Sequence, residues 1–229
     1  MLSREKAMPS IQHSGDKPVP AAGELAILQA AERLFAQQGY DGVSMRTIAL
    51  EAGVSKANIY HHFSSKESLY HAIVESSVSE TALLIEQLAD SEGDFDQKLV
   101  EFARAHLAHL FDRKNAAKLI LREAFSGVEE RSRQLSEEVF GQINQRMVSI
   151  MRAGQEAGVL RKDLEPALCV ILLLGANAFF FQAQEILKHF PEAKFAHHPD
   201  LFSEGRSDIL LNGMLETRKV LKRGGGSRS

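Results

Sequence analysis

The segment 44–66, which reads SMRTIALEAGVSKANIYHHFSSK, concentrates side chains that form hydrogen bonds and ion pairs with polar polymers. Lys56 carries an ammonium group that can bind a phosphate, and Asn58 carries an amide that can pair with the edge of an adenine. Tyr60 and His61 follow within one helical turn. These residue types at this spacing indicate contact with nucleic acid rather than covalent catalysis.

Two short helices are predicted to position these side chains. Ser44 precedes a short apolar-periodic segment, and Gly53 suits the left-handed position that ends a helix. Ser55 then stands at an N-cap position, where its hydroxyl can accept the backbone N–H of residue 58. A helix over 56–62 would bury Ile59 and, at about 100° per residue, turn the opposite face to solvent. The pattern predicts a helix-turn-helix whose second helix reads the major groove of DNA.

The whole chain has 229 residues, 44% of them hydrophobic, and a net charge of −3, so no global basic field draws it to nucleic acid. Within 44–66, three cations face one anion, which gives a local positive charge. Cys169 is the single cysteine, so no intramolecular disulfide is possible, and we expect a cytoplasmic protein with a buried, inert thiol.

The remaining sequence predicts an all-α fold of about nine helices. Apolar residues recur at helical spacing over 23–38, 64–88, 95–113, 115–125, 129–157, 166–190 and 206–221. The pair Ser64 and Glu67 predicts a capping box at the start of the fourth helix. The segment 191–204 is expected to be a loop. We expect a leader over 1–22, a DNA-binding domain over 23–68, a larger domain over 69–223 and a flexible tail over 224–229.

Two segments admit alternative interpretations. The leader is expected to be disordered, or to form an arm whose Arg4, Lys6 and Lys17 touch DNA. The helix over 166–190 is apolar nearly all round, but its continuous apolar run is far shorter than the roughly 20 residues of a membrane span. It is expected to lie between helices or at a subunit interface, without a membrane.

The segment from Ile27 to Tyr70 closely resembles the DNA-binding domain of the TetR family of transcriptional regulators. The matching motifs are A-x-x-L-F at 31–35, S-M-R-x-I-A at 44–49, A-G-V-S-K at 52–56 and Y-x-H-F at 60–63. The resemblance implies a non-enzymatic homodimer that pairs through the helices over 166–190 and 206–221 and binds a palindromic operator. It also implies repression relieved by a small-molecule effector. His62 stands where the family more often has an aromatic residue, and we leave it out of the contacts.

Candidate contacts follow from the exposed face together with this resemblance. Lys56 and Lys66 are predicted to reach phosphates, as the resemblance implies for Tyr60 and His61. Arg46 suits a bidentate pair with guanine. The predicted DNA-binding set is Ser44, Arg46, Ser55, Lys56, Ala57, Asn58, Tyr60, His61 and Lys66.

A cavity between helices of the larger domain is expected to hold the effector. Apolar and aromatic residues at this spacing more often form an ordinary core than a pocket. The candidate lining residues are Phe102, His106, Arg122, Phe125, Asn177 and Phe181. No cofactor or metal is expected: His106-x-x-His109 would put two imidazoles on one face, but no acidic third ligand lies beside them. A regulator controlled by a protein partner and, more remotely, a helical-bundle metalloprotein or enzyme remain as alternatives.

Overall fold

The structure, a computed structural model, describes residues 22–124, 133 and 140–215. The helices are α1 (Ala22–Gln38), α2 (Met45–Ala52), α3 (Lys56–His62), α4 (Lys66–Asp90), α5 (Phe95–Asp112), α6 (Lys114–Ala124), α8 (Gly141–Glu156), α9 (Pro166–Leu187), the 3₁₀ turn η2 (Lys194–His197) and α10 (Pro199–Met214). This confirms the all-α prediction for the described residues, whose only β pairing is an isolated bridge between Leu160 and Leu215.

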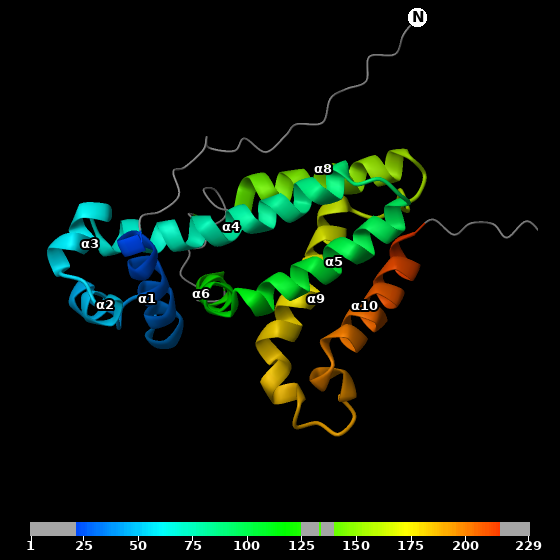
Figure 1. Cartoon of the computed structure of the whole chain (residues 1–229). Coiled ribbons are helices and arrows are strands. Elements are labelled where there is room, and N and C mark those ends of the chain that lie inside the picture. The colour runs from blue at the N-terminus through cyan, green and yellow to red at the C-terminus, as the bar shows by residue number, and fades with distance from the viewer. Residues whose placement is uncertain (1–21, 125–132, 134–139, 216–229) are drawn as a thin grey trace, which may run out of the picture.

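The first three helices form a small lobe at one end of the molecule, and α4 runs out of this lobe into the larger domain (Figure 1). Its core is made by residues on the predicted apolar stripes, including Ile27, Phe35, Ile48 and Ile59. Leu119 of α6 is buried in the same cluster. The N-terminal lobe and the larger domain therefore share packed side chains.

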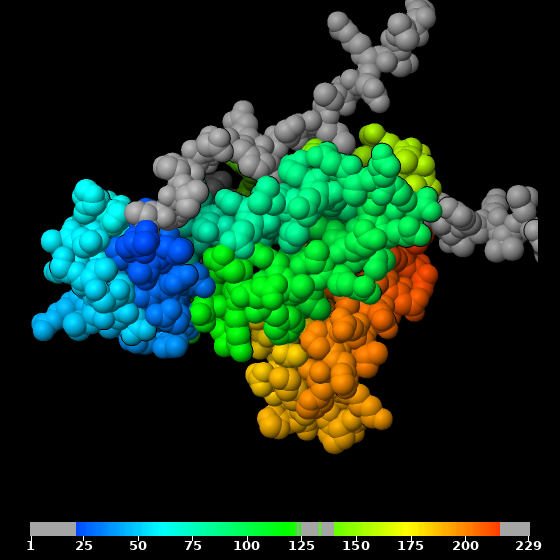
Figure 2. Space-filling model, viewed as in Figure 1, coloured from blue at the N-terminus to red at the C-terminus, as the bar shows by residue number. Residues whose placement is uncertain are grey.

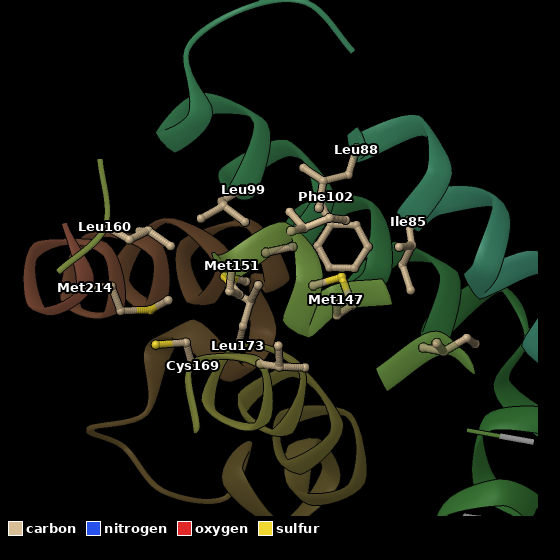
Figure 3. Packing of buried hydrophobic residues seen from close by; sticks show 14 of the residues in the cluster. Ile85, Leu88, Leu99, Phe102, Met147, Met151, Leu160, Cys169, Leu173 and Met214 are labelled. Carbon is tan, nitrogen blue, oxygen red and sulfur yellow. The ribbon is translucent and has the colours of Figure 1, made fainter. Parts of the chain in front are cut away.

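The larger domain packs α4, α5, α8, α9 and α10 around a second apolar core. Figure 3 shows Phe102 of α5 beside Met147 and Met151 of α8, with Leu173 of α9 below them. Cys169 is buried in this cluster, and burial raises the pKa of its thiol, as expected for an unreactive cysteine.

The start of α4 differs from the prediction by one residue. Ser65, not Ser64, is the N-cap: its hydroxyl accepts the backbone N–H of Ser68, whose own hydroxyl accepts the N–H of Ser65. The capping box therefore pairs two serines rather than Ser64 with Glu67. Adjacent serines offer the same chemistry, so local sequence alone does not separate them.

The prediction of a loop over 191–204 is also wrong in the second half of that segment. The turn η2 occupies Lys194–His197, and α10 begins at Pro199 rather than at residue 206. Proline suits the first turn of a helix because its missing N–H would have no partner there. Phe202 of α10 stacks on Phe180 of α9 at 4.0 Å between ring centroids, which holds this early turn against α9.

Other predicted ends lie partly outside the described residues. The helix expected over 129–157 is described as α8 from Gly141, and residues 216–221 of the expected last helix are not described. The helix α9 ends at Leu187 rather than at residue 190. By length and composition, α9 is the one helix in the described ranges that could cross a membrane. It packs against α5 and α8 and buries the polar Asn177, as a core helix of a bundle does.

A close approach at Gly154 of α8 generates a stability prediction. A Cβ atom there would lie 2.7 Å from Cζ of Phe95 and 3.0 Å from Cδ1 of Leu160. Gly154→Ala should therefore lower the free energy of unfolding by about 1–3 kcal/mol, as overpacked cores do. Urea denaturation measures this change. Arg152→Ala, on the exposed side of the same helix, should change it by less than about 0.5 kcal/mol. Equal effects of the two substitutions would contradict the tight contact.

Candidate functional site

The turn between α2 and α3 is held by satisfied backbone groups at both helix ends. Gly53 adopts φ 67° and donates its N–H to the carbonyls of Ala49 and Leu50. Ser55 accepts the backbone N–H of Asn58 at 3.1 Å, as predicted for the N-cap. The side chain of Ser44 accepts the N–H of Thr47 at 3.1 Å and so caps α2. These bonds fix the rotation of α3 relative to α2.

One side of α3 packs against the core of the N-terminal lobe through Ile59. Ile59 has no exposed surface, and the N–H of Phe63 closes the helix on the carbonyl of Ile59 at 2.8 Å. Lys56, Ala57, Asn58, Tyr60 and His61 are all exposed, as predicted. His62 is only partly exposed, and its Nδ1 lies 3.8 Å from Oε2 of Glu24 on α1, so it lies apart from this outward face.

The exposed face carries cations that are available to a partner. Lys56 lies with its Nζ 5.6 Å from the ring centroid of Tyr60, and no acidic group of the described residues pairs with it. Arg46, in the first turn of α2, is exposed and likewise has no acidic partner among these residues. By contrast, Arg33 of α1 is engaged with Glu51 of α2 at 3.0 Å. Two exposed cations and the exposed Asn58 amide are therefore available to contact a polyanion.

Lys66 is placed differently from the predicted phosphate contact. Its Nζ donates to the carbonyls of Tyr40 at 2.9 Å and Val43 at 3.1 Å, and lies 4.1 Å from the Tyr40 ring centroid. Two of its three donors thus hold the turn between α1 and α2 against the start of α4. We therefore assign Lys66 a positioning role, which the sequence did not indicate because its partners lie 26 and 23 residues away.

A cavity of about 440 Å³ lies in the larger domain between α4, α5, α6, α8 and α9. Its walls are mostly apolar, and the polar side chains that reach it are Ser77, Thr81, His106, His109, Arg113 and Asn144. This volume lies within the range of small-molecule sites.

Five of the six predicted effector residues lie within the described ranges, and of these five only His106 lines the cavity. Phe102 belongs to the core cluster, and Phe181 packs edge-on against Phe111 at 5.3 Å between centroids. Asn177 is fully buried behind the wall and contacts Nδ1 of His106 at 3.0 Å. Phe125 lies outside the described residues.

Arg122 lies at the contact with the DNA-binding lobe, where its guanidinium donates to the carbonyls of Phe35 at 3.4 Å and Ala36 at 3.0 Å. Both carbonyls belong to the last turn of α1, and the Phe35 carbonyl also accepts the backbone N–H of Gly39 at 2.9 Å. A second link uses Arg113, which lines the cavity and contacts Glu80 of α4 and Glu32 of α1. Sequence reasoning missed this link because the ion pairs join residues far apart in the chain.

The histidine pair considered as a metal site is divided between two partners. His106 contacts Asn177, whereas Nδ1 of His109 lies 3.6 Å from Oε2 of Glu80. Within the described ranges, no group of three or more His, Cys, Asp or Glu side chains is arranged to hold a metal ion.

The two lysines generate a paired prediction. Lys56→Met should weaken binding to all DNA sequences and reduce the slope of log affinity against log salt by about 1, because one phosphate contact is lost. Lys66→Met should lower thermal stability and affinity but leave this slope unchanged, because its ammonium binds backbone carbonyls. Fluorescence anisotropy at several salt concentrations measures both slopes. A reduced slope for Lys66→Met would instead show that Lys66 contacts a phosphate.

Asn58 generates a prediction about sequence preference. Asn58→Ala should cost about 1–3 kcal/mol at one base position and leave binding to other sequences nearly unchanged, because an amide pair with adenine is lost while the backbone cap remains. Competition between the best DNA site and its single-base variants measures the change. A uniform loss across all sequences would instead indicate a phosphate contact.

Comparison with known proteins agrees with this arrangement. A model of bacterial regulatory proteins of the TetR family matches residues 27–73. A second model, the Tetracyclin repressor-like C-terminal domain, matches residues 92–180. Together they span more than half of the chain.

Curated relatives match parts of the chain that differ in length. The transcriptional repressor AcnR of Corynebacterium efficiens is 39% identical over 69 residues, which are 30% of this chain and 36% of the relative. The chain thus matches little more than a third of the length of such relatives. The repressor KstR2 of Mycobacterium tuberculosis is 26% identical over 151 residues, 62% of this chain and 70% of that protein.

Solved structures extend the likeness to the larger domain. The ketosteroid regulator KstR2 of Mycobacterium tuberculosis superimposes with a TM-score of 0.65 at 20% identity, covering 86% of this chain and 97% of the other. At this identity the likeness shows the fold. With both family models, the named regulators and the helix-turn-helix geometry in agreement, the chain belongs to the TetR family of bacterial DNA-binding transcriptional regulators.

Proposed function

We propose that the protein is a homodimeric transcriptional repressor that binds a palindromic operator and is released from it by a small molecule. The observation that carries this proposal is the outward face of α3, where Lys56, Asn58 and His61 are exposed on a helix anchored by Ile59. The repressor names of AcnR and KstR2 support the sign of regulation.

The roles of the exposed residues follow from their chemistry. Lys56, Tyr60 and His61 contact phosphates, while Asn58 and Arg46 read base edges. Ala57 is small enough for α3 to approach the groove closely. Ser44 and Ser55 cap their helices, and the N-terminal N–H groups that they order lie at the positive helix ends that attract phosphate.

The homodimer is proposed to form through α9 and α10. Both helices expose large apolar side chains: Phe179 is 68% exposed, Ile186 65% and Ile209 73%. The series continues along α9 with Leu168, Ile171 and Leu172. Such a patch is expected to be covered, and a second copy of the same two helices would cover it as a four-helix bundle. In Figure 2, α9 and α10 project from the body on the side away from α4. A two-fold axis there would present two copies of α3 to two operator half-sites.

The effector is proposed to act through α6. Ala117, Ile120 and Leu121 of this helix line the cavity, while Leu119 is buried in the core of the DNA-binding lobe. Arg122 of the same helix binds the end of α1. A molecule that binds better when α6 is displaced would therefore favour a different placement of α1 and α3. Its effect on DNA affinity is limited to its differential affinity for the two states.

One substitution tests the dimer on which operator recognition depends. Phe179→Asp should yield a monomer at micromolar concentration and lower the affinity for DNA with two half-sites at least tenfold, about 1.4 kcal/mol, because it places a charge in an apolar interface. Light scattering and fluorescence anisotropy measure the two effects.

Leu83→Asp is the matched control. Leu83 is 49% exposed on α4, outside the proposed interface, so this variant should remain dimeric and bind DNA normally. A dimeric Phe179→Asp protein with unchanged DNA affinity would rule out this interface.

A further inference from the structure

A buried polar cluster joins α5, α9 and α10 behind the cavity wall. Asn177 of α9 donates its amide N–H to the carbonyl of Ala103 at 2.8 Å, and the same Nδ2 lies 3.0 Å from Nδ1 of His106. Arg206 of α10 donates to Oδ1 of Asn177 and, at 3.2 Å each, to the hydroxyls of Ser203 and Ser207. Asn177 has no exposed surface, so its amide is set by these neighbours alone.

These partners determine which nitrogen of His106 carries the proton. Arg206 can only donate, so it must face the amide oxygen of Asn177, and the Ala103 carbonyl can only accept, so it must face the amide nitrogen. The Nδ2 group that reaches His106 is therefore a donor, and Nδ1 of His106 must accept from it. The neutral ring then carries its proton on Nε2.

The surroundings also keep this ring uncharged. Burial, followed by the nearby charges of His109 and Arg206, lowers the pKa of His106 to about 4. Among the charged groups near the ring, Arg206 has no carboxylate partner in the described part of the chain; its contacts there are hydroxyls, an amide oxygen and a carbonyl. At neutral pH, His106 is thus an imidazole with a fixed donor rather than a cation.

The Nε2–H of His106 is the ring donor that remains available to a molecule in the cavity. His106 lines the cavity while its Nδ1 edge is taken by Asn177. No hydrogen-bond partner for Nε2 is found among the residues that the structure describes. An N–H that opens on a mostly apolar cavity has few acceptors there, so a ligand oxygen that accepts from it gains a hydrogen bond.

The other polar groups of the cavity disfavour an anion. Arg113 also reaches it, but its guanidinium already contacts the carboxylates of Glu80 and Glu32. This triad carries no surplus positive charge. Most of the remaining wall is aliphatic, with Leu110, Ile120 and Leu174 among its members.

We propose that the cavity binds an uncharged, largely apolar molecule that carries an acceptor oxygen, such as a ketone or ester, and that His106 orients it through a hydrogen bond from Nε2–H. Asn177 and Arg206 are positioning residues that hold the ring in this tautomer. This inference rests on the proposed function in one respect, that the cavity is the effector site, and it adds the chemical class of the ligand.

Three probes of closely similar shape test the ligand class on the full-length protein. 2-Acetylnaphthalene and 2-isopropenylnaphthalene differ in a carbonyl oxygen against a methylene group, and 2-naphthoate adds a negative charge. Equilibrium dialysis should show the ketone binding about three- to tenfold more tightly than the alkene, as expected for one hydrogen bond, and the anion binding least. Equal affinities for ketone and alkene, preference for the anion, or no saturable binding of the ketone would each overturn the proposal.

Two variants and one spectroscopic measurement locate the effect. His106→Phe keeps an aromatic ring but should reduce the ketone-to-alkene ratio to about 1. Glu204→Gln, at an exposed position of α10 outside the polar cluster, should keep the wild-type ratio. The ¹⁵N chemical shifts of histidine-labelled wild-type protein should show the Nε2–H tautomer for His106 at pH 7. An Nδ1–H tautomer or an imidazolium would contradict the assignment, even if His106→Phe does not fold.

These measurements use protein without DNA, so they are independent of operator binding. A parallel titration of the ketone into the protein–DNA complex tests the proposed function instead. Ketone binding that depends on His106 without DNA release would uphold the ligand class and contradict the effector role. Release of DNA by the ketone without any dependence on His106 would uphold the effector role and contradict the role given to His106.

Discussion

The burial of Ile59 within a helix of only seven residues is the constraint on which DNA recognition depends. So short a helix has no stability of its own, so it must be held by its caps and by one buried anchor. Ser55 at the start and Phe63 at the end supply the backbone partners, and Ile59 sets the rotation. Once that side is fixed inward, the 3.6-residue period leaves Ala57, Asn58 and His61 no other direction than outward.

A small number of contacts also joins the N-terminal lobe to the larger domain. The two units share the helix α4 and the packed side chain of Leu119, and Arg122 ties α6 to the end of α1. A change in the packing of α6 around the cavity therefore cannot leave α1 unaffected. The buried guanidinium of Arg206 orients Asn177, which in turn contacts His106. Arg206 has no carboxylate partner in the described part of the chain. Buried polar groups that are hydrogen-bonded favour one arrangement of the core, whereas unpaired ones cost free energy.

The local features of the site could be predicted from sequence because each depends on residues a few positions apart. The N-cap at Ser55, the left-handed turn at Gly53 and the exposed face of α3 belong to this class. The N-cap of α4 was predicted at Ser64 rather than at Ser65, because the two adjacent serines offer the same chemistry.

Features set by distant residues could not be predicted in this way. The early start of α10 depends on stacking between Phe180 and Phe202, and Lys66 finds its carbonyl acceptors across the turn before α2. The cavity requires five helices to be packed in their final positions, so helical spacing identified only His106 among its walls. Phe102 belongs to the core, where Met147 and Met151 of α8 lie beside it, as Figure 3 shows.

Selection of bound sequences from random duplex DNA tests the central claim most directly. If two copies of α3 are presented by a symmetric dimer, the enriched sequences should be inverted repeats whose half-sites lie about one turn of DNA, roughly 10 base pairs, apart. Enrichment should disappear when the outward face of α3 is replaced by alanines while Ile59 is retained. Wild-type protein that enriches no sequence, or only an asymmetric one, would contradict the account.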